Sequence, residues 1–224
     1  GVQPAHTSRT NAGARCRSRS VCALAPGRPG RVPRAHDIVW PMPDGMPFWE
    51  VIAADAQRVG GSVDHRASLI SRHWQSFKLR RFRPSFASVF WLRVNQRIAR
   101  RRFGVQLRNW RYYRFANDIS EFAHIGAGFW LPHPIDVTIG SAVTIGKNAT
   151  IFNGVTIGGR SVDPKEALMP RLGDNVVIYT GAKVIGKITV GDNSAVGALS
   201  LCNKDIPANS IMYGIPPNVT IKPK

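Results

Sequence analysis

The stretch from Ile139 to Gly159 reads IGSAVTIGKNATIFNGVTIGG and repeats a six-residue pattern. Each unit opens with an aliphatic residue, glycine often follows it, and the fifth position is small or aliphatic. Units of the same kind recur further along the chain and open at Leu172, Ile178, Val184, Val190, Val196 and Cys202. Two apolar positions in every six, separated by Gly, Asn and Asp, predict a short strand followed by a tight corner.

The six-residue period predicts a stack of short parallel strands rather than a helix. A helix repeats every 3.6 residues and disfavours so many β-branched residues and glycines. In a parallel β-helix, each coil buries its opening residues against the coils above and below. We therefore expect a mainly β fold, with a β-helix over residues 118–210 and a tail over residues 211–224 that caps its open end.

Two interruptions of the repeat are candidate functional positions. Between Leu131 and Ile139 the spacing is eight rather than six, so two extra residues bulge from one coil, and His133 lies among them. Extra residues in a regular β structure often re-aim a side chain next to an active site. The segment 160–171 (RSVDPKEALMPR) also breaks the pattern, and loops of this kind in repeat folds often cover a binding face.

The region before the repeat is basic and helical in pattern. Residues 46–117 contain 15 Lys/Arg and three Asp/Glu, whereas residues 118–224 contain nine and eight, and the whole chain carries a net charge of +18. Apolar residues at helical spacing predict helices in this basic region, the first ending at Gly60-Gly61 and a later one at Gly104. The helices are thus expected to precede the β-helix.

Residues 1–45 have a different composition, rich in Arg, Ser, Ala, Gly and Pro and without periodicity. An organelle transit peptide is one interpretation of this composition. The preferred interpretation is a disordered or non-native extension, with Met42 or Met46 as the real start. No function is assigned to these residues.

Three interpretations are open for the segment Lys78–Arg114, in which arginines alternate with aromatic residues. It forms a solvated helix face, or it touches an anionic membrane or acidic polymer, or it binds nucleic acid. We expect no nucleic-acid binding because the sequence contains no recognisable module for it. No apolar run approaches the length of a membrane-spanning helix.

Three cysteines form no spacing typical of a zinc site or a disulfide framework, and Cys202, which opens a repeat unit, is expected to be buried. This cysteine usage favours a reducing compartment. We therefore expect the protein in the cytoplasm, with the inner face of the membrane as a second location.

His133 is the candidate general base. A neutral imidazole near pH 7 can take the proton from an acceptor hydroxyl. Asp118 precedes it by fifteen residues, about one coil, and its carboxylate would hold the imidazole tautomer and stabilise the charged form. The alternatives are that His133 caps a corner of the coil and that Asp118 is an ordinary turn residue.

The stretch from Asp118 to Gly159 resembles the serine acetyltransferases, which belong to the hexapeptide-repeat acyltransferases. The fold of that family is a left-handed parallel β-helix of triangular section, with three hexads per coil. In serine acetyltransferases an Asp and a His at this separation form the catalytic pair, and a VTLGG-like run follows, here VTIGG with Gly158 and Gly159. The resemblance implies acetyl transfer from acetyl-CoA to a hydroxyl by direct attack. It assigns catalysis to His133 and Asp118, and places the two glycines at the acetyl-CoA site.

The resemblance extends to the CoA contacts of related sugar acetyltransferases. Thr180, Ala198, Asn203 and Lys204 fall where that group binds CoA. Thr180 and Ala198 would bond the pantetheine amides, and Lys204 would meet a phosphate. Asn218 stands where the family usually has a basic residue, which weakens the phosphate site. The four residues can also be read as ordinary corner residues. The family builds its active sites between adjacent β-helices, which implies a homotrimer.

Departures from the serine acetyltransferase pattern concern the acceptor. Pro132 replaces an Asp, and Leu168-Met169 replaces an Arg-His pair. These charged residues hold the amino-acid acceptor in that family. The pattern is more similar to exopolysaccharide O-acetyltransferases, so we expect acetylation of a sugar hydroxyl, with L-serine as the alternative acceptor.

Two other classes are weighed against an acetyltransferase. Some left-handed β-helix proteins are metal-dependent carbonic anhydrases, which need three His ligands, and the repeat contains only His124 and His133. We therefore expect no metal. A non-enzymatic β-helix scaffold is the remaining alternative, although it would have no reason to place a histidine in a bulge.

Overall fold

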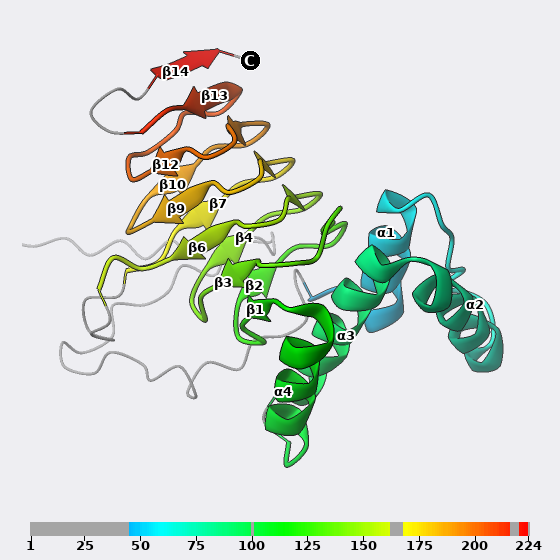
Figure 1. Cartoon of the computed structure of the whole chain (residues 1–224). Helices are drawn as coiled ribbons and strands as arrows, with labels where there is room; N and C mark the ends of the chain where they lie inside the picture. The colour runs from blue at the N-terminus through cyan, green and yellow to red at the C-terminus, as the bar shows by residue number, and fades with distance from the viewer. Residues whose placement is uncertain (1–44, 100, 162–167, 216–219, 224) are drawn as a thin grey trace, which may run out of the picture. The chain divides into compact units, whose positions relative to one another are not determined.

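The structure, a computed structural model, describes residues 45–99, 101–161, 168–215 and 220–223, all within one compact unit. Apart from Gly45, the predicted N-terminal extension lies outside the described residues, as does Asn218. Within the described ranges, four helices precede the strands: α1 (Phe48–Arg58), α2 (Leu69–Phe82), α3 (Pro84–Ile98) and α4 (Gly104–Phe115). Figure 1 shows them beside one end of a stack of strands.

The strands form three sheets, which the chain visits in turn, and every strand pair except β13–β14 is parallel. The first sheet contains β1 (Asp118–Ile119), β3 (Thr138–Ile139), β6 (Thr156–Gly158), β9 (Lys183–Ile185) and β12 (Leu201–Cys202). The second contains β2 (His124–Ile125), β4 (Thr144–Ile145), β7 (Arg171–Leu172) and β10 (Thr189–Val190). The third contains β5 (Thr150–Ile151), β8 (Val177–Ile178), β11 (Ala195–Val196), β13 (Ser210–Tyr213) and β14 (Thr220–Pro223). The predicted β-helix with three sides is therefore confirmed.

The opening residues of the repeat units form the core of the β-helix. In the second sheet, for example, Ile125, Ile145, Leu172 and Val190 lie one above another and are buried. Each aliphatic side chain that is fully buried contributes about 1.5–3 kcal/mol of apolar transfer free energy. Columns of this kind explain why strands only two residues long hold their register.

Asparagines turn the corner between the second and third sheets. Asn148, Asn175, Asn193 and Asn209 have positive φ values of 56–58°, a conformation that Asn tolerates better than most residues. Each side-chain amide donates to the next asparagine along the stack, at 3.2, 3.0 and 3.2 Å. Asn therefore has two roles in these repeat units. Its backbone adopts the positive φ of the corner, and its side chain joins the column of hydrogen bonds between stacked corners.

The register locates the two-residue bulge. Thr138 pairs with Thr156, so a regular coil consists of three repeat units. Asp118 pairs with Thr138, and the coil between them is longer than a regular one by two residues. The extra residues lie in the corner that carries His133, as the spacing predicts.

Two further coils depart from the regular length. Thr144 pairs with Arg171, and the loop that begins at Arg160 makes this coil longer than a regular one. Residues 162–167 of that loop lie outside the described residues. Val190 pairs with Ile206, so the coil that contains the unit opening at Cys202 is shorter than a regular one. The six-residue pattern does not indicate this shortening.

The C-terminal strands differ from the expected tail. β13 still pairs in parallel with β11 and continues the third sheet, so the stack extends beyond residue 210. Among the described strands, only β14 turns back and pairs antiparallel with β13. The strand register places the change of direction after Tyr213.

The helices differ from expectation at Gly104, which begins α4 instead of ending a helix. A Cβ at this position would lie 2.5 Å from the carbonyl oxygen of Ala99, so only glycine allows the close approach of the chain here. Gly60, with φ of +70°, follows α1 as the sequence predicts. The apolar pattern therefore locates one helix end and misplaces another.

A buried ion pair joins the helices to the first coil of the β-helix. The Arg93 guanidinium, 0% exposed, donates from Nε to the Asp55 carboxylate at 2.9 Å. Its terminal nitrogens donate to the carbonyl oxygens of Ile125 at 2.6 Å and Gly126 at 2.7 Å. The other Asp55 oxygen accepts from the backbone N–H of Phe129 at 2.8 Å. Arg93 on α3 and Asp55 on α1 thus supply hydrogen-bond partners to the β-helix end.

We predict that Arg93→Met lowers the free energy of unfolding by about 3–5 kcal/mol, because it leaves the Asp55 charge buried without its partner. Urea unfolding followed by circular dichroism would measure this. Arg108→Met, at an exposed position on α4, should change the value by no more than about 0.5 kcal/mol. Equal stability of the two variants would show that Arg93 does not anchor the helices.

Candidate functional site

The predicted site residues lie on two edges of the triangular coil, one on each side of the first sheet. We call the corner between the third and first sheets the third–first edge, and the corner between the first and second sheets the first–second edge. The third–first edge carries His133, Thr180 and Ala198. The first–second edge carries Gly158, Gly159, Asn203 and Lys204.

The third–first edge is built from stacked corners. Backbone N–H groups donate to carbonyl oxygens one coil earlier: Gly154 to Ile135 at 3.3 Å, Gly181 to Asn153 at 2.9 Å, and Leu199 to Thr180 at 2.9 Å. Thr180 and Ala198 are both exposed, and the Thr180 hydroxyl donates to the Asn153 side chain at 3.3 Å. Both predicted CoA contacts on this edge are therefore accessible.

His133 is exposed at the third–first edge, between two prolines. Its carbonyl oxygen accepts from the Ile135 N–H at 2.8 Å, and the Pro134 carbonyl accepts from the Asn117 side chain at 2.9 Å. The prolines restrict φ on both sides of the histidine. The prolines and these hydrogen bonds thus restrict the backbone of the bulge, and the His133 side chain is in contact with solvent.

Asp118 lies at the start of β1, on the side of the first sheet that adjoins the third–first edge. It is exposed, and its backbone N–H donates to Val137 at 2.9 Å. The structure thus brings Asp118 and His133 to the same edge. Within the described residues, no hydrogen bond joins the carboxylate to the imidazole.

A buried cation lies beneath Asp118, where the sequence pattern did not indicate one. Arg111 on α4 is 2% exposed and donates to Asn95 at 2.9 Å and to the Ile119 carbonyl at 3.3 Å. Burial lowers the pKa of Arg111 to about 10, and the charges of Glu121 and Asp118 oppose that shift. Arg111 precedes the buried Phe115 by four residues, which is the sequence signal for the inner face of α4.

A cavity of about 400 Å³ adjoins Asp118 between the end of α4 and the first sheet. Its lining includes Tyr112, Tyr113, Asn117, Asp118, Asp136 and Thr138. The Tyr113 ring is 84% exposed. Aromatic rings beside carboxylates present an apolar surface and hydrogen-bond acceptors to one ligand. No sequence pattern indicates this cavity, because its walls come from one helix and two strands that belong to different parts of the sequence.

The first–second edge combines accessible and buried groups. Lys204 is exposed, and its carbonyl accepts from the buried Cys202 thiol at 3.4 Å. Burial raises the pKa of that thiol to about 11. The Asn203 side-chain oxygen is buried and finds no hydrogen-bond partner among the described residues. A Cβ at Gly158 would meet nothing within 4 Å, so packing within the chain does not require glycine there.

Of the positions that replace charged acceptor contacts, Leu168 and Met169 lie near the first–second edge, whereas Pro132 lies beside His133 on the third–first edge. Leu168 is half exposed, while Met169 packs against the core beside Gly140. His124 begins β2 in the second sheet, away from the edge that carries His133. No group of three His, Cys, Asp or Glu side chains arranged for a metal ion occurs in the described part of the chain.

No protein-family model matches this chain. Its sequence is similar to curated serine acetyltransferases: that of Bacillus pumilus is 42% identical over 105 residues, and one of Staphylococcus aureus is 39% identical over 102 residues. These alignments cover 47% and 46% of this chain, and 48% and 47% of the relatives. The chain thus spans about half the length of the curated relatives that it matches.

Solved structures extend the similarity to most of the chain. Serine acetyltransferase from Neisseria gonorrhoeae matches with a TM-score of 0.66 and 26% identity, over 79% of this chain and 65% of that one. A serine acetyltransferase in complex with CoA matches with a TM-score of 0.60 and 25% identity, over 77% and 68%. The chain is therefore serine acetyltransferase-like in sequence and in fold, and its β-helix has the left-handed form of those structures.

Proposed function

We propose that the chain is an acetyl-CoA-dependent O-acetyltransferase with His133 as general base and Asp118 as its charge partner. One observation carries the proposal: the two-residue bulge presents His133 to solvent on the same edge as Thr180 and Ala198. A histidine that only capped a corner would need no extra residues. The similarity to serine acetyltransferases supports the same reaction class.

The reaction would proceed by direct attack. His133 takes the proton of the acceptor hydroxyl while the oxygen attacks the thioester carbonyl carbon of acetyl-CoA. The tetrahedral intermediate collapses, the C–S bond breaks, and the imidazolium returns its proton to the CoA thiolate. Asp118 stabilises the imidazolium, as a carboxylate does in a His–Asp pair.

Acetyl-CoA would lie along the edges of the first sheet. Thr180 and Ala198 offer hydroxyl and backbone groups to the pantetheine amides, and Lys204 offers an ammonium group to a phosphate. Gly158 and Gly159 have no side chain, so acetyl-CoA could approach the backbone closely there. A Cβ at Gly158 would point into open space, since it would meet no atom of this chain within 4 Å. The buried oxygen of Asn203 makes that residue the weakest member of the set.

The proposed site is complete only in a homotrimer. His133 and Thr180 lie on the third–first edge, whereas Asn203 and Lys204 lie on the first–second edge, with the first sheet between them. A threefold axis parallel to the long axis of the β-helix would bring one edge of each chain against the other edge of its neighbour. The resulting groove would be deeper than one edge provides.

Serine is the acceptor that the names of the similar proteins support. A sugar hydroxyl is the second candidate, for two reasons specific to this chain. Pro132, Leu168 and Met169 offer no charge to the ammonium and carboxylate of a free amino acid. The cavity beside Asp118 presents the faces and edges of Tyr112 and Tyr113, which suit the apolar faces of a sugar ring.

We predict that His133→Ala lowers kcat about 10²–10⁴-fold, the usual range of a general-base contribution, with little change in KM for acetyl-CoA. Asp118→Asn should cost less, because it only removes a charge beside the imidazole. His73→Ala, at an exposed histidine on α2, is the matched control and should leave kcat unchanged. Turnover of His133→Ala close to that of the wild type would exclude the proposed base.

The acceptor experiment incubates the enzyme with acetyl-CoA and either serine or a panel of oligosaccharides, and follows CoA release and product mass. With serine as the acceptor, we expect O-acetylserine to form at sub-millimolar serine. Acetylated glycan without O-acetylserine would replace serine by a sugar, and Tyr113→Ala should then raise KM for the glycan. Release of CoA without acetylation of serine or of any glycan would contradict O-acetyl transfer to these acceptors.

Sedimentation velocity tests the assembly. We predict a trimer, because the proposed CoA contacts are divided between two edges of each chain. Mixing His133→Ala subunits with Lys204→Met subunits should restore part of the activity if a site draws on neighbouring chains. An active monomer would contradict the trimer.

A further inference from the structure

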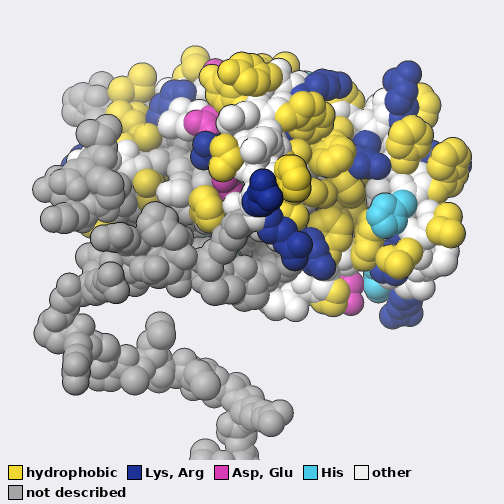
Figure 2. Space-filling view, turned by 90° about the horizontal axis from the view of Figure 1, so that it is seen from below, with side chains coloured by type: hydrophobic (Ala, Val, Ile, Leu, Met, Phe, Trp, Pro, Cys, Tyr) yellow, Lys and Arg dark blue, Asp and Glu magenta, His cyan; other side chains and the backbone are white. Residues whose placement is uncertain are grey.

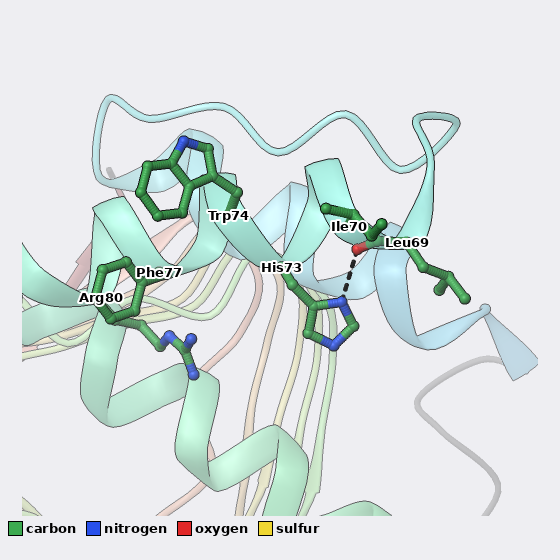
Figure 3. Close-up of a pocket in the computed structure, with 6 residues that line it drawn as sticks. All are labelled: Leu69, Ile70, His73, Trp74, Phe77 and Arg80. Carbon is green, nitrogen blue, oxygen red and sulfur yellow. Dashed lines mark hydrogen bonds between the residues drawn. The ribbon is translucent and has the colours of Figure 1, made fainter.

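α2 presents an apolar face that the described part of the chain leaves uncovered. Of its residues only Ser76 is buried, whereas Ile70 is 84% exposed, Trp74 58% and Phe77 51%. Figure 3 shows these side chains, with Leu69, projecting from successive turns of the helix. Large apolar side chains scattered singly are normal on a surface, but several on one helix face indicate an interaction site.

The exposed side chains form one organised surface. The Trp74 and Phe77 rings stack, with centroids 5.8 Å apart and planes 17° apart. A hollow of about 550 Å³ extends over this face from Leu69 to Arg80. The His73 imidazole, which lines the same hollow, donates from Nδ1 to the Leu69 carbonyl at 2.7 Å and so satisfies one of its ring nitrogens within the helix.

The surface continues from α2 onto α3 and α4. A second hollow, of about 280 Å³, shares Phe77 and Arg80 with the first and reaches Trp91 and Trp110. The indoles of Trp91 and Trp110 contact each other edge to face at 5.3 Å. We call the exposed surface from Leu69 to Trp110 the aromatic–basic face.

Positive charge surrounds the aromatic–basic face, although two arginines of this region, Arg93 and Arg111, are buried and Arg93 pairs with Asp55. Residues 65–117 contain 14 Lys/Arg and no Asp or Glu. Lys78 and Arg81 are exposed on α2, and the Lys78 ammonium lies 5.3 Å from the Trp74 ring centroid. Figure 2 shows hydrophobic, Lys/Arg and His side chains interspersed at the right of the view, where Figure 1 places α2.

These properties fit an anionic lipid surface better than other partners. Exposed Leu69 and Ile70 would find no partner on a nucleic acid, where aromatic side chains stack on bases and basic ones meet phosphates. A second copy docked by the same face would bring two surfaces rich in Lys and Arg together, and like charges repel. A bilayer takes apolar side chains at the headgroup–acyl boundary, tryptophan at the interface, and Lys/Arg beside anionic headgroups.

We propose that the aromatic–basic face docks the protein on the surface of an anionic phospholipid bilayer. Ile70, Trp74 and Phe77 enter the headgroup–acyl boundary, while Lys78 and Arg81 lie among the phosphates. No helix in the described ranges is long and apolar enough to cross a membrane. The docking is independent of the acetyltransferase proposal, because none of these residues belongs to the proposed site.

Flotation of the full chain with vesicles tests this docking. We expect binding to vesicles that contain phosphatidylglycerol, little binding to phosphatidylcholine alone, and weakening as salt is raised. Each Lys/Arg at a membrane surface strengthens binding about fivefold, so Lys78→Glu/Arg81→Glu should weaken binding by at least about 25-fold. Ile70→Ser/Trp74→Ser should weaken it on every vesicle, since it removes the inserted side chains.

Control variants change an isoleucine and a lysine that lie far from α2 in the sequence. Ile215→Ser and Lys222→Glu, both at exposed positions near the C-terminal strands, should bind vesicles like the wild type. Circular dichroism and sedimentation velocity on every variant exclude unfolding and altered assembly as causes. All substitutions are at exposed side chains, so the fold should persist.

Three outcomes would overturn the docking proposal. The first is no binding of the folded wild type to anionic vesicles at low salt. The second is equal loss of binding in the control variants. The third is that the α2 variants bind vesicles normally but change the oligomeric state, which would assign the aromatic–basic face to a second copy.

Discussion

The contact between the Arg93 guanidinium and the first coil is the constraint on which the rest of the structure depends. A stack of coils ends in backbone groups and apolar columns that no further coil covers. Arg93 reaches two carbonyl oxygens of that end, and Asp55 neutralises the arginine and accepts a backbone N–H in the same place. If any one of these groups is removed, the others are left as buried charges or buried polar groups without a partner.

The sequence predicts those features that depend on neighbours in the repeat. The six-residue period specifies the inward columns, and the eight-residue spacing around His133 specifies the bulge, because each coil lies directly on the next. Asn at the corner position is likewise predictable, since positive φ favours it. Local pattern and global fold agree in these places, which is typical of sequences that fold reliably.

Features that join distant segments could not be predicted in this way. Arg93 and Arg111 look like members of a solvated basic run, yet both are buried, because their partners lie in the first coil. The tyrosine-lined cavity beside Asp118 and the exposed face of α2 depend on how the helices pack, which no period encodes. The short unit that opens at Cys202 could not be predicted for a different reason. The next inward position is Ile206, two residues earlier than the six-residue period predicts.

The antiparallel strand β14 limits what the parallel stack can do. A parallel β-helix adds each coil by the same hydrogen bonds, so an open last coil would be a template for further strands, including those of other molecules. β14 occupies the edge of β13 in the opposite direction and presents Lys222 and Pro223, a charge and a residue without an N–H. With α3 packed on the first coil, a non-β or reversed segment stands at each end of the stack and opposes its extension by strands of other molecules.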